Sequence, residues 1–210
     1  MNNLSLNKII EILKNEYPNS EPELDYKNSL ELLIATILSA QCTDKRVNIV
    51  TKSLFKKYNT PKDYAVSDLS DLEQEIYSTG FYKQKAKNIK ACCRKLLTDF
   101  GGEIPADFDK LNSLPGVGRK TASVVAANAF NIPAIAVDTH VKRVTNRLGL
   151  VTSNSPEKIE LELKKIFSKK YWIKTSHWFI LLGRYICIAR KPKCEVCKLT
   201  QYCKYFNKGK

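Results

Sequence analysis

Four cysteines near the carboxyl end of the chain have a spacing that suits metal binding. They are Cys187, Cys194, Cys197 and Cys203, in the pattern C-x6-C-x2-C-x5-C. Thiolates this close together can ligate Zn²⁺ or an iron–sulfur cluster, and softness alone does not separate the two. One C-x2-C pair with two outlying cysteines suits a loop wrapped around a cluster better than the paired knuckles of a zinc ribbon. The charged residues between them leave little apolar surface to bury four free thiols.

A glycine-rich turn at residues 114–122, LPGVGRKTA, lies between two stretches of helical period. Gly116 and Gly118 permit a tight hairpin, and the helix that follows begins with amide groups that have no intrahelical partner. These amides and the helix dipole favour an anion such as phosphate. An ordinary connection between packed helices would also explain the glycines. The cations Arg119 and Lys120 directly after them favour phosphate binding.

An acidic residue follows an apolar run at residues 134–141, AIAVDTHV. Asp138 is expected to cap the next helix, which is a common reason for aspartate at such a place. It is also a candidate for a carboxylate presented at the edge of a cleft. Both roles are compatible, because capping amides would keep the carboxylate ionised and fixed in direction.

Apolar residues recur every three or four positions through most of the chain, which predicts an all-α protein. The predicted helices cover residues 4–17, 29–39, 43–58, 67–77, 83–100, 107–113, 119–130, 139–148, 155–167 and 175–190. Pro61 is expected to stop the third of them. The second is apolar on all sides and is expected to cross a core. Cys42, Cys92 and Cys93 lie in helical stretches, where we expect them to pack rather than react.

Positive charge is concentrated in the last third of the chain. The net charge is +14, and residues 140–210 carry 17 Lys and Arg against four acidic residues. This asymmetry predicts a polyanionic partner, either nucleic acid or an anionic membrane surface, although lysine is also a common surface residue. The longest apolar-rich stretch, residues 32–40, is far below the roughly 20 residues that a membrane span needs. We therefore expect a cytoplasmic protein, in which the seven cysteines do not form a disulfide framework.

In this order, the hairpin with Lys120, then Asp138, then the cysteine loop resemble the endonuclease III branch of the helix-hairpin-helix DNA glycosylases. The resemblance implies two helical lobes. Residues 22–132 would form a six-helix barrel with the helix-hairpin-helix, and residues 1–21 and 133–210 would form a lobe holding one [4Fe–4S] cluster on the four cysteines. The active site of that family lies in the cleft between the lobes.

The resemblance also implies an enzyme of base excision repair that removes oxidised pyrimidines from duplex DNA. The damaged nucleotide would be flipped out of the stack. Lys120 matches the catalytic lysine and would attack C1′ to form a Schiff base, its pKa lowered by Arg119 and partial burial. Asp138 matches the catalytic aspartate, which stabilises positive charge and assists proton transfer. β-Elimination would then cleave the strand 3′ of the abasic site.

Other residues are expected to contact the DNA, which a monomer would bind at a damaged pyrimidine or abasic site. Gln41 matches the residue that fills the gap left by the flipped nucleotide. Phe81 stands where relatives often carry a leucine wedge, and an aromatic ring can intercalate in the same way. The remaining expected contacts are Gly116, Val117, Gly118, Arg119, His140, Arg143, Lys191 and Lys193. For His140, a structural role is an equal alternative.

Three other functions fit parts of the pattern. A glycosylase for mismatched adenine shares the hairpin, the aspartate and the cluster, but Lys120 and the lack of further sequence after Lys210 disfavour it. A non-catalytic DNA-binding module would use the cysteine loop only as a brace. An electron carrier would need a cluster that cycles without DNA, and no residue requires that.

Overall fold

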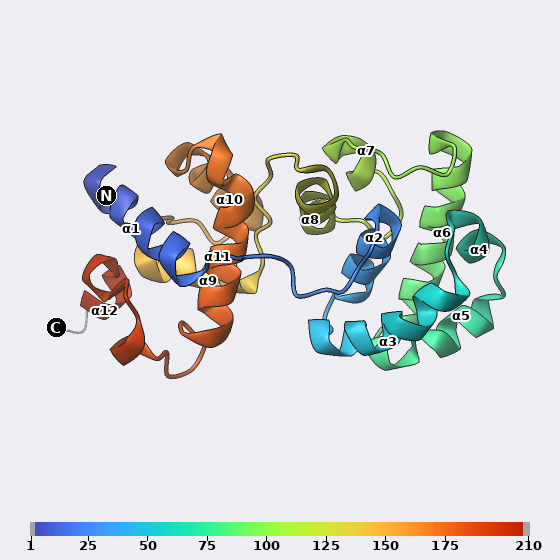
Figure 1. Cartoon of the computed structure of the whole chain (residues 1–210), viewed down its shortest axis with the longest axis horizontal. Coiled ribbons are helices and arrows are strands. Elements are labelled where there is room, and N and C mark those ends of the chain that lie inside the picture. Colours follow the sequence, from blue (N-terminus) through green and yellow to red (C-terminus); the bar gives the residue numbers. More distant parts are fainter. Residues whose placement is uncertain (1–2, 208–210) are drawn as a thin grey trace. The chain divides into compact units, whose positions relative to one another are not determined.

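The structure is a computed structural model that describes residues 3–207 and contains only helices and connecting segments over that range (Figure 1). The α-helices are α1 (Asn3–Glu16), α2 (Ser29–Leu38), α3 (Asp44–Lys57), α4 (Pro61–Val66), α5 (Leu69–Glu75), α6 (Tyr82–Phe100), α7 (Phe108–Asn112), α8 (Arg119–Phe130), α9 (Thr139–Leu148), α10 (Pro156–Ile166), α11 (Trp172–Tyr185) and α12 (Lys204–Asn207). Short 3₁₀ turns occur at Tyr77–Thr79, Lys169–Tyr171, Cys194–Val196 and Thr200–Tyr202. The predicted all-α class is confirmed.

The chain forms two compact units. Glu23–Ile132 makes up the central unit, and the segments before and after it make up the terminal unit. Each unit has its own cluster of buried apolar side chains. None of the helices within residues 3–207 is both long and apolar enough to cross a membrane.

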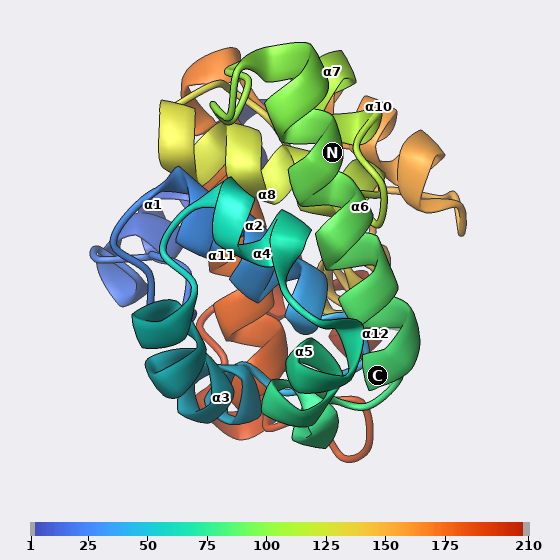
Figure 2. The same ribbon diagram turned by 90° about the vertical axis from the view of Figure 1, so that its right-hand side faces the viewer.

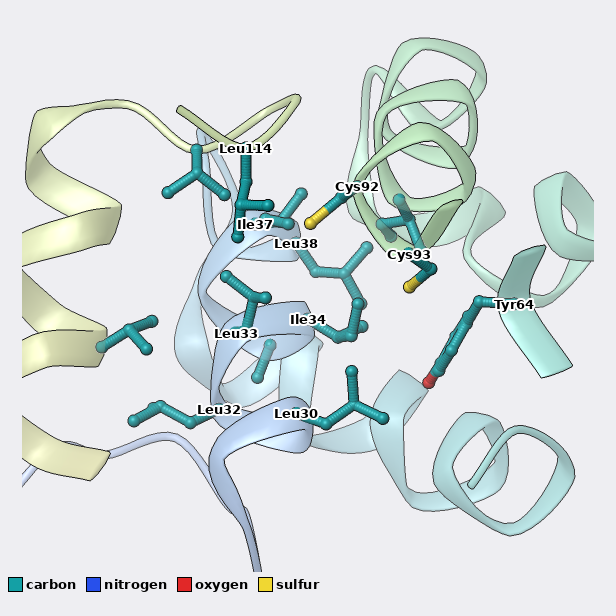
Figure 3. Packing of buried hydrophobic residues seen from close by; sticks show 14 of the residues in the cluster. Leu30, Leu32, Leu33, Ile34, Ile37, Leu38, Tyr64, Cys92, Cys93 and Leu114 are labelled. Carbon is teal, nitrogen blue, oxygen red and sulfur yellow. The ribbon is translucent and has the colours of Figure 1, made fainter. Parts of the chain in front are cut away.

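Helix α2 forms the core of the central unit, as its apolar sequence predicts. Eight of its ten residues are buried. Figure 3 shows Leu32 pointing to one side of α2 and Ile34 pointing to the other, toward Cys93 and Tyr64. Helix α8 packs against α2, and α4 and α5 lie along α6 (Figure 2).

Pro61 begins a short helix that the sequence analysis did not predict. Helix α3 stops at Lys57, and α4 then starts with Pro61 in its first turn. Proline suits that position because its missing N–H would have no partner there. Thr60 and Asp63 form a capping box that fixes the start of α4. The central unit therefore contains seven α-helices, of which α4 is the one that periodicity did not predict.

The two adjacent cysteines of α6 pack in the core, as predicted. Cys92 and Cys93 are fully buried among the apolar side chains of the central unit. Burial raises the pKa of the Cys92 thiol to about 12, so it stays protonated and inert at neutral pH.

The N-terminal helix belongs to the terminal unit. Ile9 and Leu13 of α1 are buried in the same apolar cluster as Trp178 and Phe179 of α11. This packing brings the beginning of the chain together with α9, α10 and α11, whose buried residues complete the cluster. The terminal unit is thereby a core built from both ends of the sequence, and it supports Asp138 and the cysteine loop.

Candidate active site and cysteine loop

A hairpin joins helices α7 and α8, and its backbone accepts only glycine at position 116. Gly116 has a φ of +76°, in the left-handed region, and a Cβ there would lie 2.7 Å from Cβ of Asn88 on α6. Leu114 and Val117 are buried and anchor the turn, and the Val117 N–H donates to the Leu114 carbonyl over 3.1 Å. The two apolar side chains thus fix the hairpin to the core, while its two glycines are exposed to solvent.

Helix α8 begins without a side-chain cap, unlike α7 and α9, which begin at capping aspartates. Its N-cap residue is Gly118, and its first turn contains no acidic residue. Such a terminus presents backbone N–H groups and the positive end of the helix dipole. The guanidinium of Arg119 lies 5.0 Å from the centre of the Phe108 ring. Lys120 is exposed on this first turn, contrary to the partial burial expected for it. Its amine therefore lies beside the positive end of the helix dipole.

Asp138 caps α9, as predicted. Its Oδ1 accepts a hydrogen bond of 2.8 Å from the Val141 N–H. The preceding run, residues 134–137, is buried, and the Ala136 N–H donates to the hydroxyl of Ser176 on α11. Asp138 is half-buried, and within residues 3–207 its Oδ2 has no hydrogen-bond partner. One carboxylate oxygen is therefore fixed by the helix, and the other is available to a ligand.

His140 and Arg143 are linked to each other and to the end of α11. Arg143 donates through Nε to the Cys187 carbonyl over 3.0 Å and through Nη2 to the Gly183 carbonyl over 2.8 Å. The same Nη2 lies 3.1 Å from Nδ1 of His140. These contacts give both side chains a structural role, and their contact with DNA stays a prediction.

Gln41 and Phe81 share an unusual backbone conformation. Both are non-glycine residues with left-handed φ, at +53° and +49°. Gln41 is exposed after the end of α2, and the Phe81 side chain is 67% exposed just before α6. An apolar ring exposed to this extent on a tight loop is available for insertion between bases.

The four cysteines line one pocket, together with apolar residues of α9 and α11. A zinc site would bring all four sulfurs to about 2.3 Å from one atom. Within residues 3–207, however, no three Cys, His, Asp or Glu side chains are close enough to hold a single ion. The pocket gathers the four thiols that an iron–sulfur cluster needs as ligands.

The surroundings of the cysteines disfavour thiolates that have no cation beside them. Burial, followed by the neighbouring Cys187 and Cys203, raises the pKa of the Cys194 thiol. Burial is also the main cause that raises the pKa of Cys197. Four thiolates in this pocket would therefore repel one another, and the iron of a cluster offsets that cost.

Arg147 holds the beginning of the cysteine loop, which the sequence did not predict. Its guanidinium donates to the Ile188 and Ala189 carbonyls over 2.7 and 2.8 Å and to the Cys187 sulfur over 3.4 Å. Helix α11 ends at Tyr185 rather than at the predicted residue 190. The Gly183 carbonyl, which would accept from the Cys187 N–H in a longer helix, accepts from Arg143 instead, and the Cys187 N–H donates to the Leu182 carbonyl over 2.7 Å. The four-residue spacing of Arg143 and Arg147 was the available signal, since it places both on one helix face.

Lys191 and Lys193 are both exposed in the loop between the first two cysteines. The backbone N–H of Lys193 donates to the Ile186 carbonyl over 3.0 Å, which ties the loop to the end of α11. Lys198, further along, pairs with Glu16 of α1 over 2.7 Å. The first two lysines are thus placed to meet an anion, and their contact with DNA stays a prediction.

Comparison with known proteins places the chain in a repair family. Residues 34–169 match the model of the HhH-GPD superfamily of base excision DNA repair proteins. Residues 187–203, from the first to the last cysteine of the loop, match the iron–sulfur binding domain of endonuclease III.

Curated relatives and solved structures agree over the whole chain. Endonuclease III of Rickettsia felis is 48% identical over 96% of this chain and 95% of the relative, and that of Escherichia coli is 42% identical over 99% of both. Two solved structures of endonuclease III with DNA, a trapped covalent intermediate and a non-covalent complex, each match 100% of this chain with a TM-score of 0.95 and 46% identity. The matches extend over 99% and 98% of the chains in those two structures. The chain therefore belongs to the endonuclease III family, DNA-binding glycosylase/AP lyases of base excision repair that carry a [4Fe–4S] cluster.

Proposed function

We propose that this protein removes oxidised pyrimidines from duplex DNA through a Schiff base on Lys120 and cleaves the strand 3′ of the abasic site. The observation that carries this proposal is an exposed amine on the first turn of a helix that begins at glycine, with no side-chain cap. It is supported by the likeness, over the whole chain, to a relative in which a covalent intermediate with DNA has been trapped.

Lys120 acts as the nucleophile. The lone pair of its neutral Nζ attacks C1′ of the damaged nucleotide, and the bond between C1′ and the base breaks. The base leaves with the bonding electron pair and takes up a proton, and a second proton leaves Nζ. The C1′–O4′ bond then breaks as the nitrogen lone pair forms a double bond to C1′, and O4′ takes up a proton, which opens the sugar ring and gives an iminium ion between Nζ and C1′.

Strand cleavage follows from the acidity that the iminium gives to C2′. Loss of a C2′ proton breaks the C3′–O bond, and the phosphate leaves with that electron pair. Water then hydrolyses the Schiff base, which frees Lys120 and leaves an unsaturated aldehyde on the 3′ end. Nζ thus takes part in both base removal and strand cleavage.

Asp138 stabilises the positive charge that develops on the sugar and relays protons. Its Oδ1 is held by the Val141 N–H, which leaves Oδ2 to face the reacting sugar. A carboxylate fixed by a helix cap needs little reorganisation as charge develops, so its electrostatic stabilisation of the transition state is preorganised.

The DNA is held by contacts with its backbone and by insertion at the lesion. The amides after Gly116 and Gly118 bind a phosphate, and Lys191 and Lys193 contact the backbone from the cysteine loop. Gln41 and Phe81 enter the stack that the flipped nucleotide has left. The four cysteines, Cys187, Cys194, Cys197 and Cys203, hold the cluster that braces this loop.

Base removal and strand cleavage can be measured separately on a duplex that contains one thymine glycol. The products are resolved directly, to show strand cleavage by the protein, or after hot alkali, to show every released base. We expect the wild type to give both signals, and Lys120→Gln to lose both by at least about 100-fold. Lys110→Gln, an exposed lysine of α7 on the other side of the hairpin, is the matched control and retains both. Base release by Lys120→Gln at the wild-type rate would instead indicate a hydrolytic glycosylase.

A further inference from the structure

Lys85 of α6 is a buried lysine whose ammonium binds two backbone carbonyls. The residue is only 5% exposed. Its Nζ donates to the Leu38 carbonyl over 2.7 Å and to the Thr79 carbonyl over 2.8 Å. No acidic side chain pairs with it in the part of the chain that the structure describes. Lysine is among the residues least often buried, so its position demands an explanation.

The two carbonyls belong to the ends of two separate elements. Leu38 is the last residue of α2, where the helix leaves carbonyls without an intrahelical partner. Thr79 is the last residue of the 3₁₀ turn Tyr77–Thr79. A cation at such ends satisfies the carbonyls and the negative end of the helix dipole. The ammonium of Lys85 therefore fixes the distance between the ends of two segments that are far apart in sequence.

Each of these ends leads directly into a residue that is expected to enter the DNA. Gln41 follows Leu38 by three residues, and Phe81 follows Thr79 by two. Both have the left-handed backbone that is rare outside glycine and persists only where the surrounding structure imposes it. The Lys85 N–H also donates to the Phe81 carbonyl over 3.0 Å, so the same residue holds the second loop by its backbone as well.

Burial lowers the pKa of Lys85, with Cys42 acting weakly in the other direction. Burying this ammonium costs desolvation free energy, and only hydrogen bonds to carbonyls compensate for it. An apolar side chain at this position would avoid that cost.

We propose that Lys85 is a positioning residue that holds the loops 39–43 and 80–81 in one arrangement, so that Gln41 and Phe81 enter the duplex together. This role rests on the proposed function, because it requires that the two side chains recognise a lesion. Lys85 itself touches neither DNA nor the reacting atoms.

The same helix supplies a matched control. Lys90, five residues further along α6, donates through Nζ to the Ala65 and Ser67 carbonyls. It joins the end of α4 to the segment before α5, and neither carries a residue expected to contact DNA. Lys90→Met therefore removes the same kind of ammonium–carbonyl link without touching the two loops.

The test measures binding to two duplexes that differ at one position, one intact and one carrying a tetrahydrofuran abasic analogue that cannot form a Schiff base. The lesion preference is the ratio of the two Kd values. We expect Lys85→Met to reduce this preference roughly tenfold and Lys90→Met to leave it within about twofold. In a Gln41→Ala/Phe81→Ala background, Lys85→Met should change the remaining preference by no more than about twofold, because the residues through which it acts are gone.

Equal effects of Lys85→Met in the two backgrounds, or an unchanged preference in the wild-type background, would overturn the positioning role. A wild type without lesion preference would instead contradict the proposed function. Far-UV circular dichroism and the Tm establish that each variant is folded. If Lys85→Met does not fold, Lys85→Gln replaces it in the same cycle, because its amide keeps a donor, and a loss of roughly threefold is expected.

Discussion

At the scale of single residues, Asp138 combines two roles that substitution can separate. Asparagine caps a helix about as well as aspartate, but it carries no charge and relays no proton. We therefore expect Asp138→Asn to slow base release by about 100-fold or more while the free energy of unfolding and the Kd for DNA stay nearly unchanged. Single-turnover kinetics and urea unfolding measure the two effects.

Asp138→Ala is the companion variant, because it removes the cap as well as the charge. It should lose the same catalytic factor and, in addition, about 1 kcal/mol of stability. If Asp138→Asn releases the base at the wild-type rate, the carboxylate has no part in the chemistry and is only a cap.

A second prediction at this scale concerns pH. Burial lowers the pKa of His177 on α11 to about 4, below its ordinary value near 6.5. The unfolded chain then binds more protons than the folded chain between these values. The neutral histidine contributes its full stability above about pH 6.5, and this stability falls as the pH drops toward 4, by about 3 kcal/mol in all.

Urea unfolding at pH 5 and pH 7.5 tests this. His177→Gln should show a smaller loss of stability between the two pH values than the wild type. His140→Gln, which replaces the only other histidine, should lose as much as the wild type. An unchanged pH dependence in His177→Gln would show that other groups cause the acid sensitivity.

At the scale of elements, the hairpin between α7 and α8 depends on one glycine and not on the other. An alanine at position 116 would need a left-handed φ and would place Cβ 2.7 Å from Cβ of Asn88. At position 118, φ is −82° and nothing lies within 4 Å of an added Cβ. We expect Gly116→Ala to cost about 1 to 3 kcal/mol of stability and to weaken DNA binding.

Gly118→Ala is the control, expected to stay within about 0.5 kcal/mol of the wild type. Thermal unfolding gives the stability, and fluorescence anisotropy with a labelled duplex gives the affinity. Equal stability of the two variants would contradict the tight approach of α6 to the hairpin.

Periodicity predicted most of the elements, and the exceptions have physical causes. The all-round apolar character of α2 correctly predicted a core helix, because its leucines and isoleucines face neighbours on every side. Pro61 was read as a stop signal, although proline also suits a first helical turn, and Thr60 with Asp63 was the missed capping box. The end of α11 was missed because Arg143 of α9, 40 residues earlier in the chain, binds the Gly183 carbonyl that a longer helix would need.

For the candidate site, too, local features could be predicted from the sequence and features that depend on distant contacts could not. Spacing in sequence was enough to predict the hairpin, the cap at Asp138 and a metal site on the four cysteines, with a cluster favoured over zinc, since each is a local pattern. The [4Fe–4S] cluster itself was implied by the family resemblance. The roles of Lys85 and Arg147 could not be predicted, because their partners are carbonyls, and every residue carries one. Only the fold brings the ammonium of Lys85 to the ends of two segments.

At the scale of the whole molecule, two separate cores predict a local response to iron removal. The cysteine loop is bound by α9 and α11, whose buried residues belong to the terminal unit. Loss of the cluster leaves four half-buried thiols without the group that links them, which should loosen that unit. We expect amide hydrogen exchange to accelerate in α9 and α11 after chelation of iron, and to stay unchanged in α2.

Mass spectrometry of peptides from the holoprotein and the iron-free protein measures this exchange. The four cysteines lie in the terminal unit, whereas α2 lies in the core of the central unit and serves as the internal control. A uniform acceleration across both units would mean that the cluster stabilises the molecule as one cooperative body.

The central claim is that Lys120 forms a covalent bond with the damaged sugar. Borohydride reduces a Schiff base to a stable amine, so it should capture the intermediate during the reaction with a duplex that contains thymine glycol. We expect the wild type and Lys110→Gln to give a protein–DNA adduct that survives denaturation, with the linked peptide containing Lys120, and Lys120→Ala to give none. An adduct of equal yield with Lys120→Ala, or none with a wild type that releases the base, would contradict the account.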